Sequence, residues 1–309
     1  MATLGEWAAG ARPRTLPAAV APVLAGTGAA AGMGSFRWLP ALLCALLALT
    51  LQIAVNYAND YSDGVRGTDD ERRVGPMRLV GSGAATPRAV KLAALATGVV
   101  AAALGVLLCW VTGFWWLLGV GALALLATWG YTGGKRPYGY LGLGEVMVFV
   151  FFGLVATLGT TYAQAGALTG GAVCAAVAMG SLACALLMVN NLRDVATDTV
   201  AGKHTLAVRL GETRARTVFA GMVLTPFACA LAAVLLALPA PGMPLALAPL
   251  LVLTLAPVAL QLARIVRAGL SGPGLVSILR DVGRLELMVG LAFAFALWWG
   301  GPDGGLVGG

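Results

Sequence analysis

Residues 38–63 read WLPALLCALLALTLQIAVNYANDYSD, an apolar run that ends in closely spaced asparagines and aspartates. Residues 170–198, GGAVCAAVAMGSLACALLMVNNLRDVATD, repeat this arrangement. In both stretches polar residues recur every fourth position, in the pairs Asn56–Asp60, Asn59–Asp63, Asn190–Asp194 and Asp194–Asp198. Residues four apart lie on one face of a helix. Each stretch therefore predicts a helix that carries a column of oxygen-bearing side chains at its end.

The composition predicts an all-α, polytopic membrane protein. The chain has 309 residues, of which 59% are hydrophobic and only 11% are charged, and its mean hydropathy is +0.88. A membrane-spanning helix needs about 20 mainly apolar residues. Nine candidate spans, which we take as a single domain over 1–309, lie near 16–34, 38–58, 89–111, 114–131, 143–163, 169–190, 216–238, 244–263 and 282–300.

The distribution of charge supports this count. With nine spans, the N-terminus and the loops after the second, fourth, sixth and eighth spans lie on one side of the membrane. Every Lys and Arg except Arg37, and every Asp and Glu except Asp303, is then on or near that side. The positive-inside rule makes it the cytoplasmic side. Both polar columns are therefore expected to open to the cytoplasm.

The net charge of +7 invites a nucleic-acid interpretation, which the placement of the basic residues disfavours. They occupy several membrane-adjacent loops, so residues such as Arg214, Arg216, Arg264 and Arg267 are interpreted as orienting charges that contact anionic membrane lipid. The five cysteines are odd in number and lie in apolar runs, and they predict no disulfide framework.

The two columns predict a cation site. Buried carboxylates need a cation or a basic partner. Ligands that are all oxygen favour Mg²⁺, which is bound in proteins by a few carboxylates together with substrate phosphates. Lys135, Arg136 and Lys203 stand near the same membrane level and could neutralise a diphosphate. Solvated loop charges are the alternative interpretation, and it is the one we give to Asp70 and Glu71.

Several segments, in order along the chain, resemble the UbiA superfamily of intramembrane aromatic prenyltransferases. Within it they are most similar to the menaquinone-pathway branch of the actinobacterial kind, which prenylates 1,4-dihydroxy-2-naphthoate. The segments are 11–17 (ARPRTLP) with 26–28, 56–70 with 75–82 (GPMRLVGS), 131–140 with 143–145 and 149–153, and 190–211. The first motif of the superfamily is usually Asn-x3-Asp-x3-Asp. Here Asn59 and Asp63 match it, but the next position is Gly67, so Asp60 or Asp69 would have to supply the third acid.

The resemblance implies a reaction and a set of site residues. A polyprenyl diphosphate would bind through Mg²⁺ and ionise, and the naphthoate ring would attack the allylic cation and lose CO₂, which gives demethylmenaquinone. The enzyme would act in the bacterial inner (plasma) membrane. The implied metal ligands are Asp60, Asp63, Asp194 and Asp198, with Asn56, Asn59 and Asn190; Lys135 and Lys203 would hold the diphosphate; Arg12, Arg14, Arg136, Glu145 and Tyr131 are candidates around the aromatic acid and the diphosphate.

Three alternatives compete with this interpretation. A sister prenyltransferase that uses 4-hydroxybenzoate or homogentisate would share the whole diphosphate machinery. A lipid phosphotransferase of the CDP-alcohol type would need one compact acidic signature, which the sequence lacks. A cation-coupled transporter would place acids near the span centres, on a path open to both sides.

Overall fold

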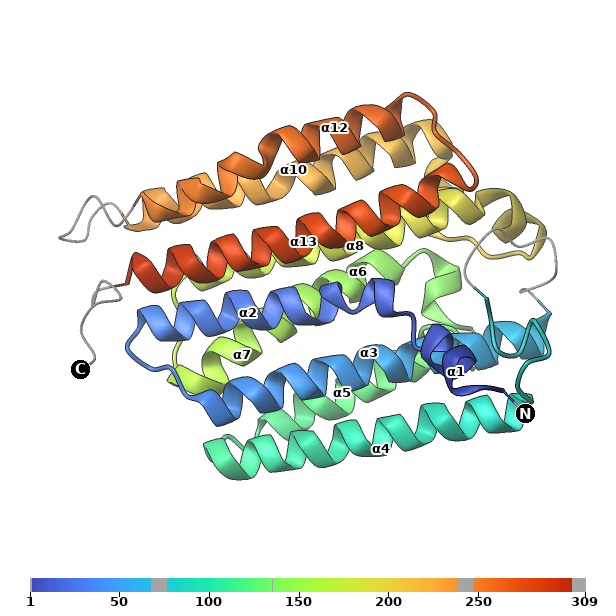
Figure 1. The fold of residues 1–309 in the computed structure, drawn as a ribbon, viewed down its shortest axis with the longest axis horizontal. Helices are drawn as coiled ribbons and strands as arrows, with labels where there is room; N and C mark the ends of the chain where they lie inside the picture. The colour runs from blue at the N-terminus through green and yellow to red at the C-terminus, as the bar shows by residue number, and fades with distance from the viewer. Residues whose placement is uncertain (1, 68–76, 135, 238–246, 302–309) are drawn as a thin grey trace.

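The structure is a computed structural model that describes residues 2–67, 77–134, 136–237 and 247–301, all of which are helices or the turns between them (Figure 1). The α-helices are α1 (Leu4–Gly10), α2 (Pro17–Gly32), α3 (Trp38–Arg66), α4 (Pro87–Thr112), α5 (Leu117–Gly130), α6 (Gly144–Val148), α7 (Ala156–Ala165), α8 (Gly170–Val200), α9 (Leu206–Leu210), α10 (Glu212–Ala237), α12 (Ala256–Arg267) and α13 (Gly274–Trp299). The other helical elements are η1 (Pro13–Thr15), η2 (Tyr138–Leu141), the π-helix η3 (Phe149–Val155) and η4 (Ala248–Leu255).

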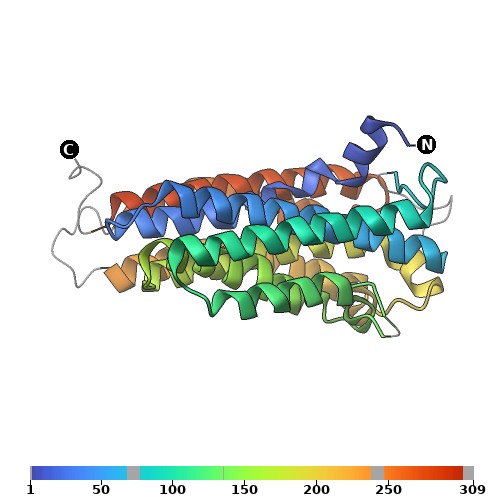
Figure 2. The same ribbon diagram turned by 90° about the horizontal axis from the view of Figure 1, so that it is seen from below.

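The long helices lie side by side along one direction and form a bundle (Figures 1 and 2). In Figure 1, α10 and α12 lie along one edge of the bundle and α4 along the other. Across the bundle, α10 packs on α8, α13 packs on α2, and α3 packs on α4. The short helix α1 projects from the end of the bundle at which α3 and α8 finish (Figure 2). Both polar columns therefore lie at the same end of the bundle.

The all-α membrane fold is confirmed, whereas the count of nine spans is not fully reached. Seven helices in the described part are long and apolar enough to cross a membrane, and the bent pair Leu4–Thr15 and Pro17–Gly32 would make an eighth. The predicted span 114–131 corresponds to α5, which has only 14 residues. At 1.5 Å per residue it reaches about 21 Å, short of the roughly 30 Å hydrocarbon layer.

Two glycines allow α2 and α13 to touch through their backbones. A Cβ atom on Gly28 would lie 2.6 Å from the carbonyl carbon of Ala294, and one on Gly32 would lie 3.0 Å from that of Leu297. Small residues four apart let membrane helices approach closely, because little else drives association in lipid. The contact fixes the position of α2, whose opposite face forms a wall of the functional site.

Arg216 does not contact lipid as the sequence suggested. Its side chain is buried, and Nη1 donates to the carbonyl oxygens of Val266 (2.8 Å) and Leu270 (2.7 Å), while Nη2 pairs with Glu212 at 3.0 Å. These carbonyls belong to the last turn of α12 and the residues after it, where no further helical turn supplies donors. Arg216 thus ties α10 to the end of α12.

We expect Arg216→Met to lower the free energy of unfolding by about 3 kcal/mol, because it leaves buried carbonyl groups without their charged donor. Thermal unfolding of the purified protein in detergent measures this. Arg214→Met is the matched control, since Arg214 is exposed on the same turn of α10. Equal shifts in the two variants would contradict the assignment of Arg216 as a buried tie.

Candidate functional site

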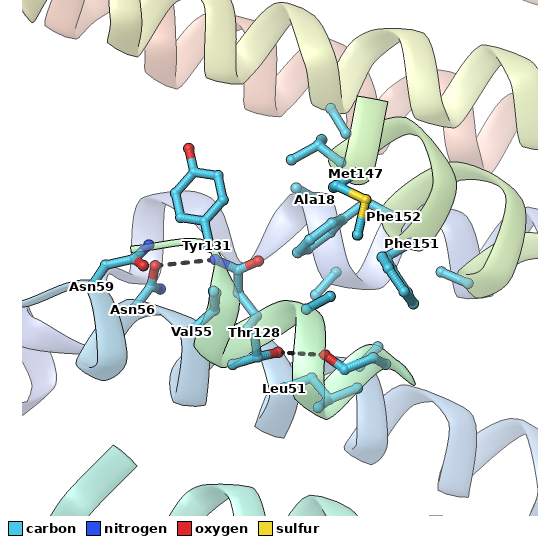
Figure 3. Close-up of a pocket in the computed structure, with 18 of the residues that line it drawn as sticks. Ala18, Leu51, Val55, Asn56, Asn59, Thr128, Tyr131, Met147, Phe151 and Phe152 are labelled. Atoms are coloured by element: carbon cyan, nitrogen blue, oxygen red, sulfur yellow. Dashed lines mark hydrogen bonds between the residues drawn. The ribbon is translucent and has the colours of Figure 1, made fainter. Parts of the chain in front are cut away.

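A cavity of about 510 Å³ runs along the bundle between α2, α3, α4, α5, the continuous α6–η3–α7 helix and α8. The polar residues at one end of its lining include Arg12, Thr15, Gln52, Asn56, Asn59, Asp63, Arg78, Tyr131, Thr132, Tyr140, Asn190, Asn191, Arg193, Asp194, Thr197, Asp198, Lys203 and Thr205. Figure 3 shows Asn56 and Asn59 beside Tyr131, with Phe151 and Phe152 across the cavity.

The residues of the first column lie on two faces of α3, of which only one lines the cavity. Asn59 and Asp63 line the cavity, whereas Asp60 does not. Asp60 is 1% exposed, and its carboxylate accepts hydrogen bonds from the backbone N–H groups of Leu79 (2.8 Å) and Val80 (3.0 Å). Neighbouring residues on a helix point about 100° apart, so Asp60 is turned toward the loop after α3. This position corrects the expectation that Asp60 faces the metal site.

Asn56 holds the N-terminal segment against α3. Its Nδ2 donates to the carbonyl oxygen of Ala11 (2.9 Å) and to Thr15 Oγ1 (3.2 Å), and its Oδ1 accepts from Gln52 Nε2 at 3.2 Å. Although Asn56 lies on the cavity wall, both the NH₂ group and the oxygen of its amide form hydrogen bonds with other residues of the protein. These bonds show that Asn56 positions the N-terminal segment, and its role as a metal ligand stays a prediction.

The segment that Asn56 holds brings Arg12 to the cavity. Arg12 has φ 54°, and it is the one residue other than glycine with positive φ in the described part of the chain. Such backbone strain persists only where the surrounding structure enforces it, and it is often found at functional sites. Of the two arginines named from the sequence, Arg12 lines the cavity, whereas Arg14 is exposed and does not.

Asp63 is the centre of the polar end. Its carboxylate accepts a hydrogen bond from the Tyr140 hydroxyl (2.7 Å). It also forms salt bridges with Lys203 Nζ at 3.1 Å and with Arg78 Nη2 at 3.5 Å. Burial favours the neutral amine of Lys203, but the nearby carboxylates of Asp63 and Asp198 and the Tyr140 phenol outweigh it and raise the pKa of Lys203. Burial and the Asp63 charge also raise the pKa of Tyr140, so it remains a donor at neutral pH.

Because the folded-state pKa of Lys203 is raised, its ammonium stabilises the fold at every pH below the unfolded value of about 10.4, and the effect is lost as the pH rises through the folded value. We expect Lys203→Met to lower the melting temperature by a constant amount between pH 7 and 9, and the difference to shrink above about pH 10.4. Thermal unfolding of both proteins across this range is the measurement. Lys91→Met, at an exposed position outside the cavity, is the control and should show no such convergence.

The second column lies on α8 as the sequence predicts. The helix continues without a break to Val200, so Asn190, Asp194 and Asp198 all line the cavity. Asp194 forms a two-pronged pair with Arg193, in which Nε and an Nη donate at 2.7 and 2.6 Å. Each column acid that lines the cavity thus has a basic neighbour on its own helix or across the cavity.

The remaining predicted residues fall in different places. Tyr131 lines the cavity, and Glu145 is buried beside it without lining it. Arg136 is exposed and does not line the cavity, and Lys135 lies outside the described residues. Gly67 ends α3 with φ 69°, a left-handed conformation that favours glycine, so the usual third acid of the motif has no helical position here. Asp69 also lies outside the described residues.

Apolar side chains line the rest of the cavity in a regular stripe. On α6–η3–α7 the lining residues recur every four positions as Met147, Val148, Phe151, Phe152, Val155, Ala156, Gly159 and Thr160. A repeat of four is longer than the 3.6 residues of an α-helical turn, and the wider turns of the π-helix η3 accommodate it. On the opposite side of η3, Gly153 packs directly against α8. The π-helix therefore keeps one face of this helix on the cavity over four turns.

The UbiA prenyltransferase family matches residues 19–271 of this chain. The chain belongs to this family. The curated 1,4-dihydroxy-2-naphthoate octaprenyltransferase of Mycobacterium tuberculosis is 49% identical over 97% of this chain and 99% of its own length. The Escherichia coli protein of the same name is 42% identical over 72% of this chain and 74% of its own length.

Solved structures show the same fold. A UbiA homolog from Archaeoglobus fulgidus bound to DMAPP and Mg²⁺ has a TM-score of 0.64 at 17% identity and covers 94% of this chain and 98% of its own. The apo structure of a UbiA homolog from Aeropyrum pernix K1 has a TM-score of 0.65 at 18% identity and covers 90% of this chain and 96% of its own. At sequence identities this low, the similarity shows a shared fold and nothing about function.

The ligand atoms that this UbiA family chain offers in the cavity are of the type that Mg²⁺ prefers. Asn59 and Asp63 from α3 and Asn190, Asp194 and Asp198 from α8 present only oxygen ligands to one cavity, as a hard cation requires. Within the described residues no three His, Cys, Asp or Glu side chains form a ready cluster. The carboxylates come from two helices, and Asp63 and Asp194 form ion pairs with arginine and lysine, an arrangement suited to a metal that arrives with phosphate oxygens.

Several polar cavity residues of this UbiA family site were not predicted as site residues. Arg78, Tyr140, Asn191 and Arg193 all line the polar end. Arg193 adjoins Asp194 and Asn191 adjoins Asn190, so adjacency to the motif was an available signal. Arg78 and Tyr140 lie in the segments 75–82 and 131–140 that resemble the family, but only tertiary contacts bring them to Asp63.

Proposed function

We propose that this chain transfers a polyprenyl group from polyprenyl diphosphate to 1,4-dihydroxy-2-naphthoate, with loss of CO₂, to give demethylmenaquinone. It acts as one domain in the bacterial plasma membrane, with the polar end of the cavity on the cytoplasmic side. The lining of the cavity supports this proposal, because acidic, amide and basic side chains lie at one end of a long apolar channel. That pattern complements a diphosphate joined to an isoprenoid tail. The shared name of the mycobacterial and E. coli relatives supports the acceptor.

The polar end would hold the diphosphate. Asp63 on α3 and Asp194 and Asp198 on α8, with Asn59 and Asn190, would hold Mg²⁺. When bound, the metal neutralises the diphosphate as a leaving group. The cavity-lining cations Arg12, Arg78, Arg193 and Lys203 would supply further positive charge and donors to the diphosphate oxygens. Lys203 and Arg78 already form salt bridges with Asp63, so both side chains are positioned before the substrate binds.

The apolar part of the cavity would hold the tail and keep water from the allylic carbon. Its α3 wall extends from Asp63 to Cys44, which at 1.5 Å per residue is about 28 Å. This is close to the thickness of the hydrocarbon layer. Phe151 and Phe152 place aromatic faces on the wall below the polar end, where they would exclude water. Ring attack and loss of CO₂ would then proceed in a dry site.

A product assay tests the proposal. Purified protein in lipid receives a polyprenyl diphosphate and Mg²⁺, with 1,4-dihydroxy-2-naphthoate or 4-hydroxybenzoate offered separately. We expect prenylated naphthoquinol and CO₂, lost with EDTA and in Asp194→Ala but not in Asp281→Ala, which changes a partly exposed acid outside the cavity. Product with 4-hydroxybenzoate alone would retain the diphosphate site and overturn the acceptor. No metal-dependent turnover with either acceptor would favour the transporter alternative.

A further inference from the structure

Asn191 presents an amide on the cavity wall, one turn of α8 before Asp194. Its Nδ2 donates a hydrogen bond to Glu145 Oε1 at 2.9 Å. The oxygen and nitrogen of an amide are told apart by the groups that surround them. A carboxyl oxygen such as Oε1 of Glu145 accepts from the NH₂ group and not from the amide oxygen. The bond therefore fixes which way round the Asn191 amide stands.

The orientation leaves Asn191 Oδ1 as a hydrogen-bond acceptor on the cavity wall. In the part of the chain that the structure describes, no donor is recorded on this oxygen, while Nδ2 is committed to Glu145. Asn191 is half-buried and lines the cavity, whereas Glu145 lies behind it and does not. The polar atom that Asn191 offers to a ligand is thus an acceptor, which can bind a hydroxyl or N–H donor.

Glu145 is buried and is held in place by two contacts with α8. It is 5% exposed in the first turn of α6, and its backbone carbonyl accepts from Cys184 Sγ on α8 at 3.0 Å. Its Oε2 is buried and finds no hydrogen-bond partner among the described residues. Burying an unpaired polar oxygen destabilises a protein, and such an atom calls for a functional explanation. Orienting Asn191 provides one.

The chemistry around Asn191 selects an aromatic hydroxyl over a phosphate. Phosphate oxygens need donors, and an acceptor backed by the carboxyl of Glu145 would repel them. The neighbouring wall is aromatic, because Tyr131 lines the cavity and its ring lies 3.3 Å from where a Cβ on Gly144 would stand. A ring that carries a phenolic hydroxyl can stack there and donate to Oδ1.

We propose that Asn191 Oδ1 accepts a hydrogen bond from a ring hydroxyl of the aromatic acceptor, and that Glu145 is the positioning residue that orients it. The inference rests on the proposed function and deepens it, since it assigns the subsite that distinguishes the acceptor from the diphosphate. Removing the hydroxyl acceptor should weaken binding of the naphthoate and leave binding of the polyprenyl diphosphate unchanged.

Steady-state kinetics with each substrate varied in turn tests the assignment. We expect Asn191→Leu to raise the KM for 1,4-dihydroxy-2-naphthoate about tenfold, the effect of one lost hydrogen bond, with less than about a twofold change in the KM for polyprenyl diphosphate. Glu145→Met should reproduce this pattern. Glu145→Gln should stay within about threefold of the wild type, because its amide oxygen still accepts from Asn191 Nδ2.

A double-mutant cycle separates positioning from a structural role. If Glu145 acts through Asn191, then Glu145→Met adds nothing to the acceptor KM in the Asn191→Leu background. Thr199→Ala is the control, at an exposed position on α8 outside the cavity. Additive effects, or equal changes in both KM values, would overturn the inference while the proposed function stands. A wild-type enzyme without naphthoate turnover would overturn both.

Discussion

Asp63→Asn is expected to lower kcat/KM for prenyl transfer by about a hundred- to a thousand-fold, the loss typical when one preorganised electrostatic group is removed from an active site. Asp63 contacts Tyr140, Lys203 and Arg78 at once, and it lies on the cavity opposite the α8 column. Asparagine keeps the shape and one acceptor oxygen but removes the charge. The Mg²⁺ concentration for half-maximal activity should therefore rise together with the loss of rate.

Asp60→Asn provides the matched comparison, because the two aspartates are three residues apart on α3. Asp60 accepts from the backbone N–H groups of Leu79 and Val80, and the amide of asparagine can accept only one of these bonds. We expect a stability loss of about 1–3 kcal/mol with an unchanged Mg²⁺ requirement. The measurements are the Mg²⁺ titration of activity and the melting temperature of each variant. The same Mg²⁺ dependence in both would contradict the division of the first column into two faces.

The second column could be predicted from the sequence because it depends on a single helix. A repeat of four positions keeps side chains on one face as long as the helix is unbroken, and α8 is unbroken through Asp198. The apolar segments were predicted for a similar reason, since length and hydropathy are local properties. Each of the nine segments overlaps a helix in the described part of the chain.

The first column could not be resolved from the sequence. Asn56–Asp60 and Asn59–Asp63 have the same spacing on the same helix, so periodicity gives no reason to prefer one pair. The choice is made by tertiary packing, because the N-terminal segment occupies Asn56 and the loop after α3 occupies Asp60. Both partners are distant in sequence or lie in a polar loop whose path no local pattern specifies.

Basic residues were the other limit of the sequence analysis. The positive-inside rule explains an arginine near a membrane surface whether it orients the protein, binds substrate or ties helices together. Arg78 lies in the site, Arg216 joins two helices and Arg214 is exposed, yet all three occur in similar loop-adjacent contexts. Only burial and hydrogen-bond partners separate these roles, and both are properties of the folded chain.

Gly28→Val is expected to destabilise the protein by at least about 4 kcal/mol, the range of the most severe single substitutions. A side chain at this position would penetrate the backbone of α13 at Ala294, which cannot move aside as a flexible side chain could. Separating α2 from α13 would also displace Ala18 and Ala19 on the cavity wall. We therefore expect both folded yield and activity to fall sharply. Size-exclusion chromatography after detergent extraction and thermal unfolding of any recovered protein measure this.

Two further variants make the expectation specific to the α2–α13 contact. Gly32→Val should behave alike, since a Cβ there would collide with the Leu297 carbonyl group one turn further along α13. Gly221→Val places the same side chain on the exposed face of α10, where nothing lies within 4 Å of the added Cβ. Because glycine is a poorer helix former than valine, this substitution is expected to change the stability by only a few tenths of a kcal/mol, in the stabilising direction. A wild-type melting temperature for Gly28→Val would show that the two helices do not meet backbone to backbone, and the position of α2 in the cavity wall would then have to be revised.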